Sequence, residues 1–236
     1  MEARALSESA VPTLALVVLV CVSSSCRQGD MKAVPRRASE DAQSCLTQIA
    51  KDVGIDVAAV RKAIDDSFEQ GGTAGTAKAA QIRLSSKIAS VRCEGLLISV
   101  WGQQEDRGAV ALELYLNDVE SEVRSLAGTA LAIGGTWSLD AVDGWIGEHA
   151  RGATDLEKGR VKSVLRNVVV VLGEQKTLNH LQKAPPLIRA FYYTLFREGY
   201  LVSGYDALES FLKAGIGDGS VLKSVTNTTP VLQWFM

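Results

Sequence analysis

Histidine is scarce in this chain, which has only two, His149 and His180, among its 236 residues. Histidine is the side chain whose charge most readily changes near neutral pH, so the chain has few candidates for acid–base catalysis. Neither histidine stands at a telling spacing from a serine, a cysteine or a carboxylate that would make it a catalytic group. We therefore interpret both as packed or surface histidines. We predict no catalytic residue, no cofactor and no enzymatic activity.

Net charge is also nearly absent, because 25 Lys and Arg residues face 27 Asp and Glu residues. Domains that bind nucleic acid carry an excess of basic side chains that neutralise phosphates, and this chain has none. We therefore expect no nucleic-acid partner. The glycine-rich stretch 71–75 lacks the lysine of a phosphate-binding loop, so we predict a flexible connector there.

The first 25 residues have the pattern of a secretory signal peptide. Arg4 precedes an apolar run over residues 11–22, and the small residues 23–25 follow it. A basic start, a short apolar region and a small-residue exit are typical of exported chains. The run is shorter than the roughly 20 apolar residues that span a bilayer. Cleavage is therefore favoured over the alternative, an uncleaved membrane helix.

The sequence V-S-S-S-C at residues 22–26 resembles the cleavage box of bacterial lipoproteins, although Ser23 stands where that family prefers leucine. The resemblance implies that Cys26 becomes an acylated N-terminus. It also implies that the chain is a membrane-anchored lipoprotein of the bacterial cell envelope, periplasmic or on the surface. Each buried CH₂ of the lipid contributes about 0.8 kcal/mol. Ordinary cleavage that leaves Cys26 as a thiol is the alternative. Residues 26–39 are polar and basic, so we predict a flexible tether.

Export would allow a disulfide between Cys45 and Cys93, the cysteines that remain in the predicted domain. No C-x-x-C pattern occurs, and histidines are few, so we predict no metal site. Exported proteins form disulfides in oxidising compartments. A Cys45–Cys93 bridge would tie the first helix to the rest of the domain. Two buried thiols are the alternative, and the sequence leaves both open.

The remaining sequence predicts an all-α fold through a recurring aliphatic–basic pair. After three copies of this pair, apolar residues follow at offsets of three, four, seven and eight, which is the stripe of one helical face. The four copies are Val91-Arg92, Val123-Arg124, Val161-Lys162 and Ile188-Arg189. Shorter helices are predicted between them, over residues 109–116, 139–149, 177–183 and 205–212. Thr154 and Glu157 have the spacing of a capping box, which predicts a helix start.

The segment 117–134, N-D-V-E-S-E-V-R-S-L-A-G-T-A-L-A-I-G, resembles a repeat of the HEAT-repeat family, with Asp118 ahead of Val123 and Arg124. The resemblance covers residues 76–214 and is loose outside this repeat. It implies an α-solenoid of about four stacked antiparallel helix pairs. It also implies that Asp118 and Arg124 link neighbouring repeats. Stacking is what buries the apolar face of each pair in such folds. We predict an N-terminal helical cap over 40–70 and a C-terminal tail over 215–236.

The aromatic side chains indicate that the protein binds a partner. Trp101, Trp137 and Trp145 lie near the junctions of successive repeats, and aromatic residues dominate binding hot spots. From this and the fold-level analogy we predict a scaffold that binds another envelope protein or a peptide. The alternatives are an enzyme or small-ligand-binding protein with a pocket between repeats, and a purely structural envelope protein. A closed pocket with His149 or His180 beside a carboxylate would favour the enzyme.

Overall fold

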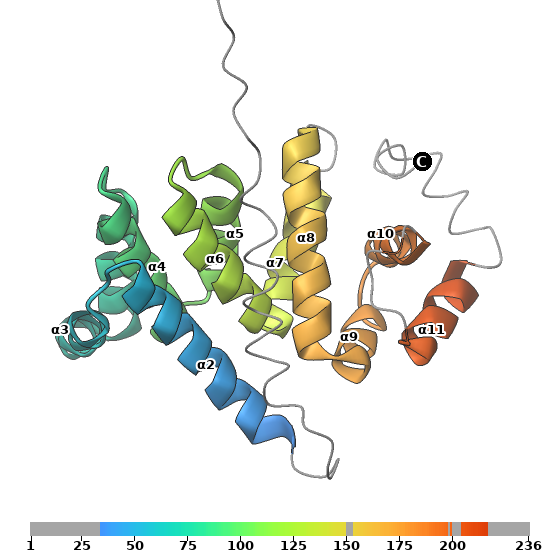
Figure 1. The fold of residues 1–236 in the computed structure, drawn as a ribbon, viewed down its shortest axis with the longest axis horizontal. Coiled ribbons are helices and arrows are strands. Elements are labelled where there is room, and N and C mark those ends of the chain that lie inside the picture. Colours follow the sequence, from blue (N-terminus) through green and yellow to red (C-terminus); the bar gives the residue numbers. More distant parts are fainter. Residues whose placement is uncertain (1–33, 150–152, 198, 200–203, 217–236) are drawn as a thin grey trace, which may run out of the picture.

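The computed structural model describes residues 34–149, 153–197, 199 and 204–216 (Figure 1). This part of the chain is all-helical, with ten helices and no strand, so the all-α prediction is confirmed there. The signal peptide, Cys26 and most of the predicted tail lie outside the described residues. Within them, no helix combines the length and apolarity needed to cross a bilayer.

Helices are present at all four aliphatic–basic pairs and at the segments between them. In chain order they are α2 (Val34–Asp52), α3 (Val57–Leu84), α4 (Ala89–Trp101), α5 (Arg107–Asn117), α6 (Ser121–Ile133), α7 (Thr136–His149), α8 (Asp155–Leu172), α9 (Glu174–Leu181), α10 (Pro186–Arg197) and α11 (Asp206–Ile216). The predicted difference in length does not hold throughout, since α7 has 14 residues and α6 has 13. The predicted capping box is present at the start of α8, where Thr154 and Glu157 exchange hydrogen bonds. It satisfies backbone N–H groups that a helix start leaves unpaired.

The predicted apolar stripes are the buried faces of α6, α8 and α10. On α6 the residues at the four offsets from Val123, Leu126, Ala127, Ala130 and Leu131, are fully buried. The equivalent stripe of α8 includes Val168 and Val169. They belong to the run 168–171, which is helical although its β-branched valines favour strands. Tertiary packing of a complete apolar face outweighs that small propensity cost.

Helices pack against their neighbours in sequence and against the next helix but one. The neighbour pairs include α3 with α4, α5 with α6, and α7 with α8. Helix α6 also packs against both α4 and α8, which we call one row of helices, and α5 packs against α7. The last helices depart from this order, since α11 packs against both α9 and α10.

The glycine-rich stretch 71–75 connects two helical arms of α3, as we expected of a connector, but it does so through a tight kink at Gly72. Gly72 has φ 59° and ψ −147°, a conformation that L side chains rarely adopt. A Cβ at Gly75 would lie 2.2 Å from the carbonyl oxygen of Ser67, so the two arms of α3 approach closely at the bend. Glycine here supplies a tight bend instead of a loose linker.

Helix α2 also differs from its predicted role as part of an N-terminal cap. It begins at Val34, inside the segment predicted as tether, and it packs against α6 as well as α3. Figure 1 shows α2 (blue) running obliquely across the molecule. Leu46 and Ala50 are its fully buried contacts. This helix therefore covers the middle of the helix rows as well as their beginning.

The first repeat copy is deeply packed although it carries a polar residue on its stripe. Ser99 on α4, eight positions after Val91, is only 1 % exposed. Close approach explains the small residues on this helix. A Cβ on Gly95 would lie 2.8 Å from the backbone nitrogen of Leu84. Helices α3 and α4 thus need glycine at this crossing.

Candidate functional site

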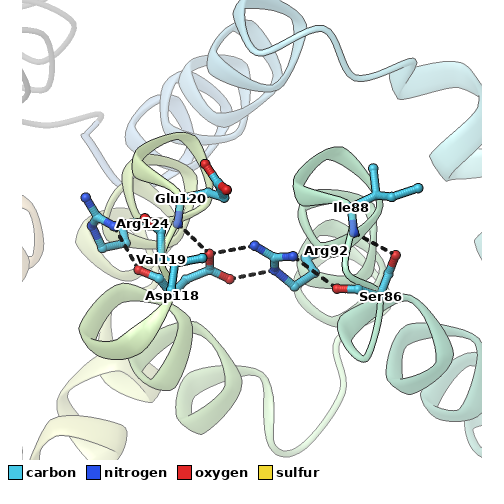
Figure 2. A network of polar contacts seen from close by, with 7 residues as sticks. All are labelled: Ser86, Ile88, Arg92, Asp118, Val119, Glu120 and Arg124. Carbon is cyan, nitrogen blue, oxygen red and sulfur yellow. Dashed lines mark hydrogen bonds and ion pairs between the residues drawn. The ribbon is translucent and has the colours of Figure 1, made fainter.

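Arg92 and Asp118 join two neighbouring helix pairs. Arg92 lies on α4, and Asp118 follows the end of α5. The guanidinium donates from Nε and Nη2 to the two carboxylate oxygens, both at 2.7 Å, as Figure 2 shows. Arg92 also donates to the carbonyl of Ser86 at 3.0 Å. A bidentate pair of this kind fixes orientation as well as distance.

Arg124 occupies the other side of the same turn (Figure 2). Its Nη1 donates to the carbonyls of Asp118 and Val119 at 2.8 and 2.9 Å, while the N–H of Glu120 donates to Asp118. Burial alone would raise the pKa of the Asp118 carboxyl. The hydrogen bonds from Arg92 and from the Glu120 N–H outweigh burial and hold that pKa below its usual value.

The predicted motif residues Asp118 and Arg124 therefore lie in one network, but they have different roles, which the sequence did not predict. Asp118 reaches back to Arg92 on the preceding pair, whereas Arg124 caps the backbone of its own turn. The forward link comes from Arg160 on α8, which donates to the carbonyl of Leu116 at the end of α5. Val123 is fully buried. These contacts hold helices α4, α5 and α8 in place.

Cys45 and Cys93 do not form the disulfide that we considered. Cys93 carries a free thiol, and both side chains are buried, on α2 and α4 respectively. Burial raises the pKa of the Cys93 thiol to about 11. Because the thiolate is the reactive form, Cys93 is a packing residue and not a nucleophile.

His180 lies beside a carboxylate, which the sequence did not predict because the two residues are 37 positions apart. Its Nε2 is 2.7 Å from Oδ2 of Asp143 on α7, and its Nδ1 is 3.7 Å from Oδ1 of Asp140. Tyr192 of α10, fully buried, donates to the other oxygen of Asp143 at 3.5 Å. The cluster thus ties together α7, α9 and α10.

The electrostatics of this cluster follow from burial and the short contact. The hydrogen bond to Asp143 raises the pKa of His180 above its usual value. Burial raises the pKa of Asp143 and raises that of Tyr192 well above its usual value. His180 lines neither of the two grooves described below. The cluster is therefore a junction between helices, and it is not the closed pocket that would favour an enzyme.

The larger groove runs between α5 and α7, with the end of α3 at its side. Its volume is about 600 Å³, and its lining is mainly apolar, including Leu84, Val110, Leu114 and Trp145. The ring of Trp145 stacks on His149, with 5.5 Å between ring centroids. His149 therefore belongs to a groove wall, and Trp145 is one of the three tryptophans that we singled out.

The other two tryptophans line a smaller groove, which lies on the row of α4, α6 and α8 beside α2. Its volume is about 320 Å³. Trp101 and Trp137 lie there, each with an arginine over its ring: Arg61 at 5.4 Å and Arg107 at 5.5 Å. Arg107 also donates to the carbonyls of Gln103 and Gln104. Its guanidinium is thus already engaged in closing the end of α4.

A metal centre finds no support in this geometry, since the described residues contain no group of three His, Cys, Asp or Glu side chains that could hold an ion. In comparisons with known proteins, no family model, no curated protein and no solved structure matches the chain. The site must therefore be interpreted from its own residues.

Proposed function

We propose that this chain is a non-enzymatic, protein-binding scaffold of the bacterial cell envelope, tethered to a membrane through an acylated Cys26. The observation that carries the binding role is the apolar groove between α5 and α7, which is open and has a tryptophan in its wall. Concave apolar surfaces with a few placed polar groups are the usual binding sites of proteins.

The order of helix contacts supports a HEAT-like solenoid. The two helices of each pair, α3–α4, α5–α6 and α7–α8, contact one another, α6 contacts both α4 and α8, and α5 contacts α7. Arg92 on α4 and Arg160 on α8 both reach the turn between α5 and α6, at Asp118 and at the carbonyl of Leu116. Repeat proteins of this kind bind partners on the extended surfaces that their rows create. The export signal and the lipoprotein-type cleavage box support the location.

Site-specific photo-cross-linking in the producing cells tests this function. The photoreactive residue benzoylphenylalanine is placed at Gln81 on α3, which lines the edge of the groove, or at Gly159 on α8, which does not line it. Both positions are exposed, so both substitutions leave the core intact. We expect a discrete protein adduct from Gln81 and none from Gly159. Adducts of equal strength from both positions, or none from either, would refute the proposed role of the groove.

A further inference from the structure

We infer that the groove between α5 and α7 binds a cationic amphipathic helix of a partner protein. This inference rests on the proposed function and specifies the chemistry of the partner. It combines three observations: the shape of the groove, the sign of the charges on its rim and a bare position at its centre.

The groove follows α7 for more than two turns and α5 for about one and a half turns. Its lining residues on α7 recur every four positions, as Asp140, Gly144 and Glu148 in one row and Ala141, Trp145 and His149 in the next. At 1.5 Å per residue, the row from Asp140 to Glu148 is about 12 Å long. An apolar trough of this length between two helices fits the apolar face of a third helix, which is a recurring mode of peptide recognition.

The rim of the groove is acidic. Asp140 and Glu148 lie at the two ends of the α7 row, and Glu113 lies on α5. No lysine or arginine lines the groove among the described residues. Opposite charges across an interface steer and orient partners, whereas like charges are rejected. A partner helix with lysines or arginines two turns apart places one cation near each end of the row.

Gly144 gives the groove its central space. It stands between Asp140 and Glu148 in the same row, is exposed, and has no atom within 4 Å of where its Cβ would be. Glycine inside a helix costs about 0.5–1 kcal/mol relative to alanine, so its presence on α7 has no stabilising role in the isolated chain. The gap accepts an apolar side chain of the partner next to Trp145.

Peptide binding to the full chain tests the inference. The probe is a fluorescent 18-residue helical peptide with a leucine face and lysines eight positions apart. Two comparison peptides carry glutamine or glutamate in place of lysine. Anisotropy titrations give each dissociation constant at low salt and again at high salt, because attraction between exposed charges is screened by salt. We expect the lysine peptide to bind at least tenfold more tightly than the glutamine peptide, and the glutamate peptide not to bind.

Three variants test whether the peptide binds in the groove. Gly144→Gln fills the central gap and should weaken binding of the lysine peptide at least tenfold. Gly147→Gln is the matched control, since Gly147 lies on the same helix outside the lining and its Cβ also meets nothing within 4 Å. The double variant Glu113→Gln/Glu148→Gln removes two rim charges and should weaken the lysine peptide severalfold while leaving the glutamine peptide unchanged.

The possible failures are distinguishable. Equal binding of the lysine and glutamine peptides, both lost in Gly144→Gln, would overturn the cationic partner and leave the groove as a protein-binding site. Binding of the lysine peptide that is unchanged in Gly144→Gln would place it outside the groove and overturn the inference. In that case only the cross-linking result at Gln81 would decide the proposed function.

Discussion

Arg92 and Asp118 lie 26 positions apart in sequence and meet through two parallel hydrogen bonds of 2.7 Å between α4 and the end of α5. Their side chains are only 11 % and 5 % exposed. The ion pair is therefore largely removed from water, and its two partners depend on each other. It fixes the position of one helix pair relative to the next.

Removing one partner of this pair should be costly. Asp118→Asn leaves the Arg92 guanidinium partly buried without its counter-ion, and we expect a loss of about 3 kcal/mol in the free energy of unfolding. The double variant Arg92→Met/Asp118→Leu removes both charges and should recover much of that loss. Urea denaturation measures both values. A loss below about 0.5 kcal/mol for Asp118→Asn would mean that the pair is a weak surface contact.

The lowered pKa of Asp118 makes the stability of the fold depend on pH. Because the folded-state pKa is lowered, the contribution of Asp118 is present above its unfolded pKa of about 3.9 and is lost as pH falls through the folded value. Wild type and Asp118→Asn should therefore converge in stability in acid. Their difference in urea midpoint between pH 3 and pH 7 tests this; a constant difference would contradict it.

Sequence periodicity predicted the helices because each needs one complete apolar face. The stripe after Val123 and the capping box at Thr154 depend only on local spacing, and both are found as expected. The connector at 71–75 is tighter than predicted because glycine permits a tight bend as readily as a loose loop. Local pattern did not distinguish these two uses.

Local sequence patterns could not predict the candidate groove or the His180 cluster. Asp143 meets His180 across 37 positions, and Gly144 joins a groove with residues of α3 and α5. Such sites depend on which helices become neighbours, a question that periodicity does not answer. The departure of α2 from its predicted capping role has the same origin, since its apolar face would suit any exposed row of helices.

His180 should hold its proton to higher pH than an unperturbed histidine, because Asp143 accepts a hydrogen bond from it. The stability that this gives is fully present below the unfolded pKa of about 6.5 and is lost as pH rises through the folded pKa. NMR titration of the His180 ring proton on Cε1 measures the shift. Asp143→Asn should lower that pKa, and an unchanged titration in this variant would rule out the Asp143 contact as its cause.

Two glycines, Gly95 on α4 and Gly144 on α7, should respond to alanine in opposite directions. Gly95→Ala introduces a methyl group 2.8 Å from the Leu84 nitrogen, so we expect a loss of about 1–3 kcal/mol in stability. Gly144→Ala places its methyl group in open space on α7 and should gain about 0.5–1 kcal/mol. Thermal unfolding of both variants measures the contrast. Similar losses in both would contradict the close packing of α3 on α4 and the open centre of the groove.

Acylation at Cys26 is tested by labelling producing cells with a clickable fatty acid. Wild type should carry label, and Cys26→Ala should carry none. Cys93→Ala is the matched control and should label like wild type, because burial keeps the Cys93 thiol protonated and enclosed. Equal labelling of wild type and Cys26→Ala would show that Cys26 is not the attachment site.

Partner retention by two glycine variants tests the central claim most directly. The protein that cross-links at Gln81 is quantified after co-purification with wild type, Gly144→Gln and Gly147→Gln. Both glycines lie on α7, and a Cβ at either position meets nothing within 4 Å. We expect Gly147→Gln to retain the partner as wild type does. We expect Gly144→Gln to lose at least nine-tenths of the partner at an undiminished melting temperature. Equal retention by both variants would contradict a binding role of the groove.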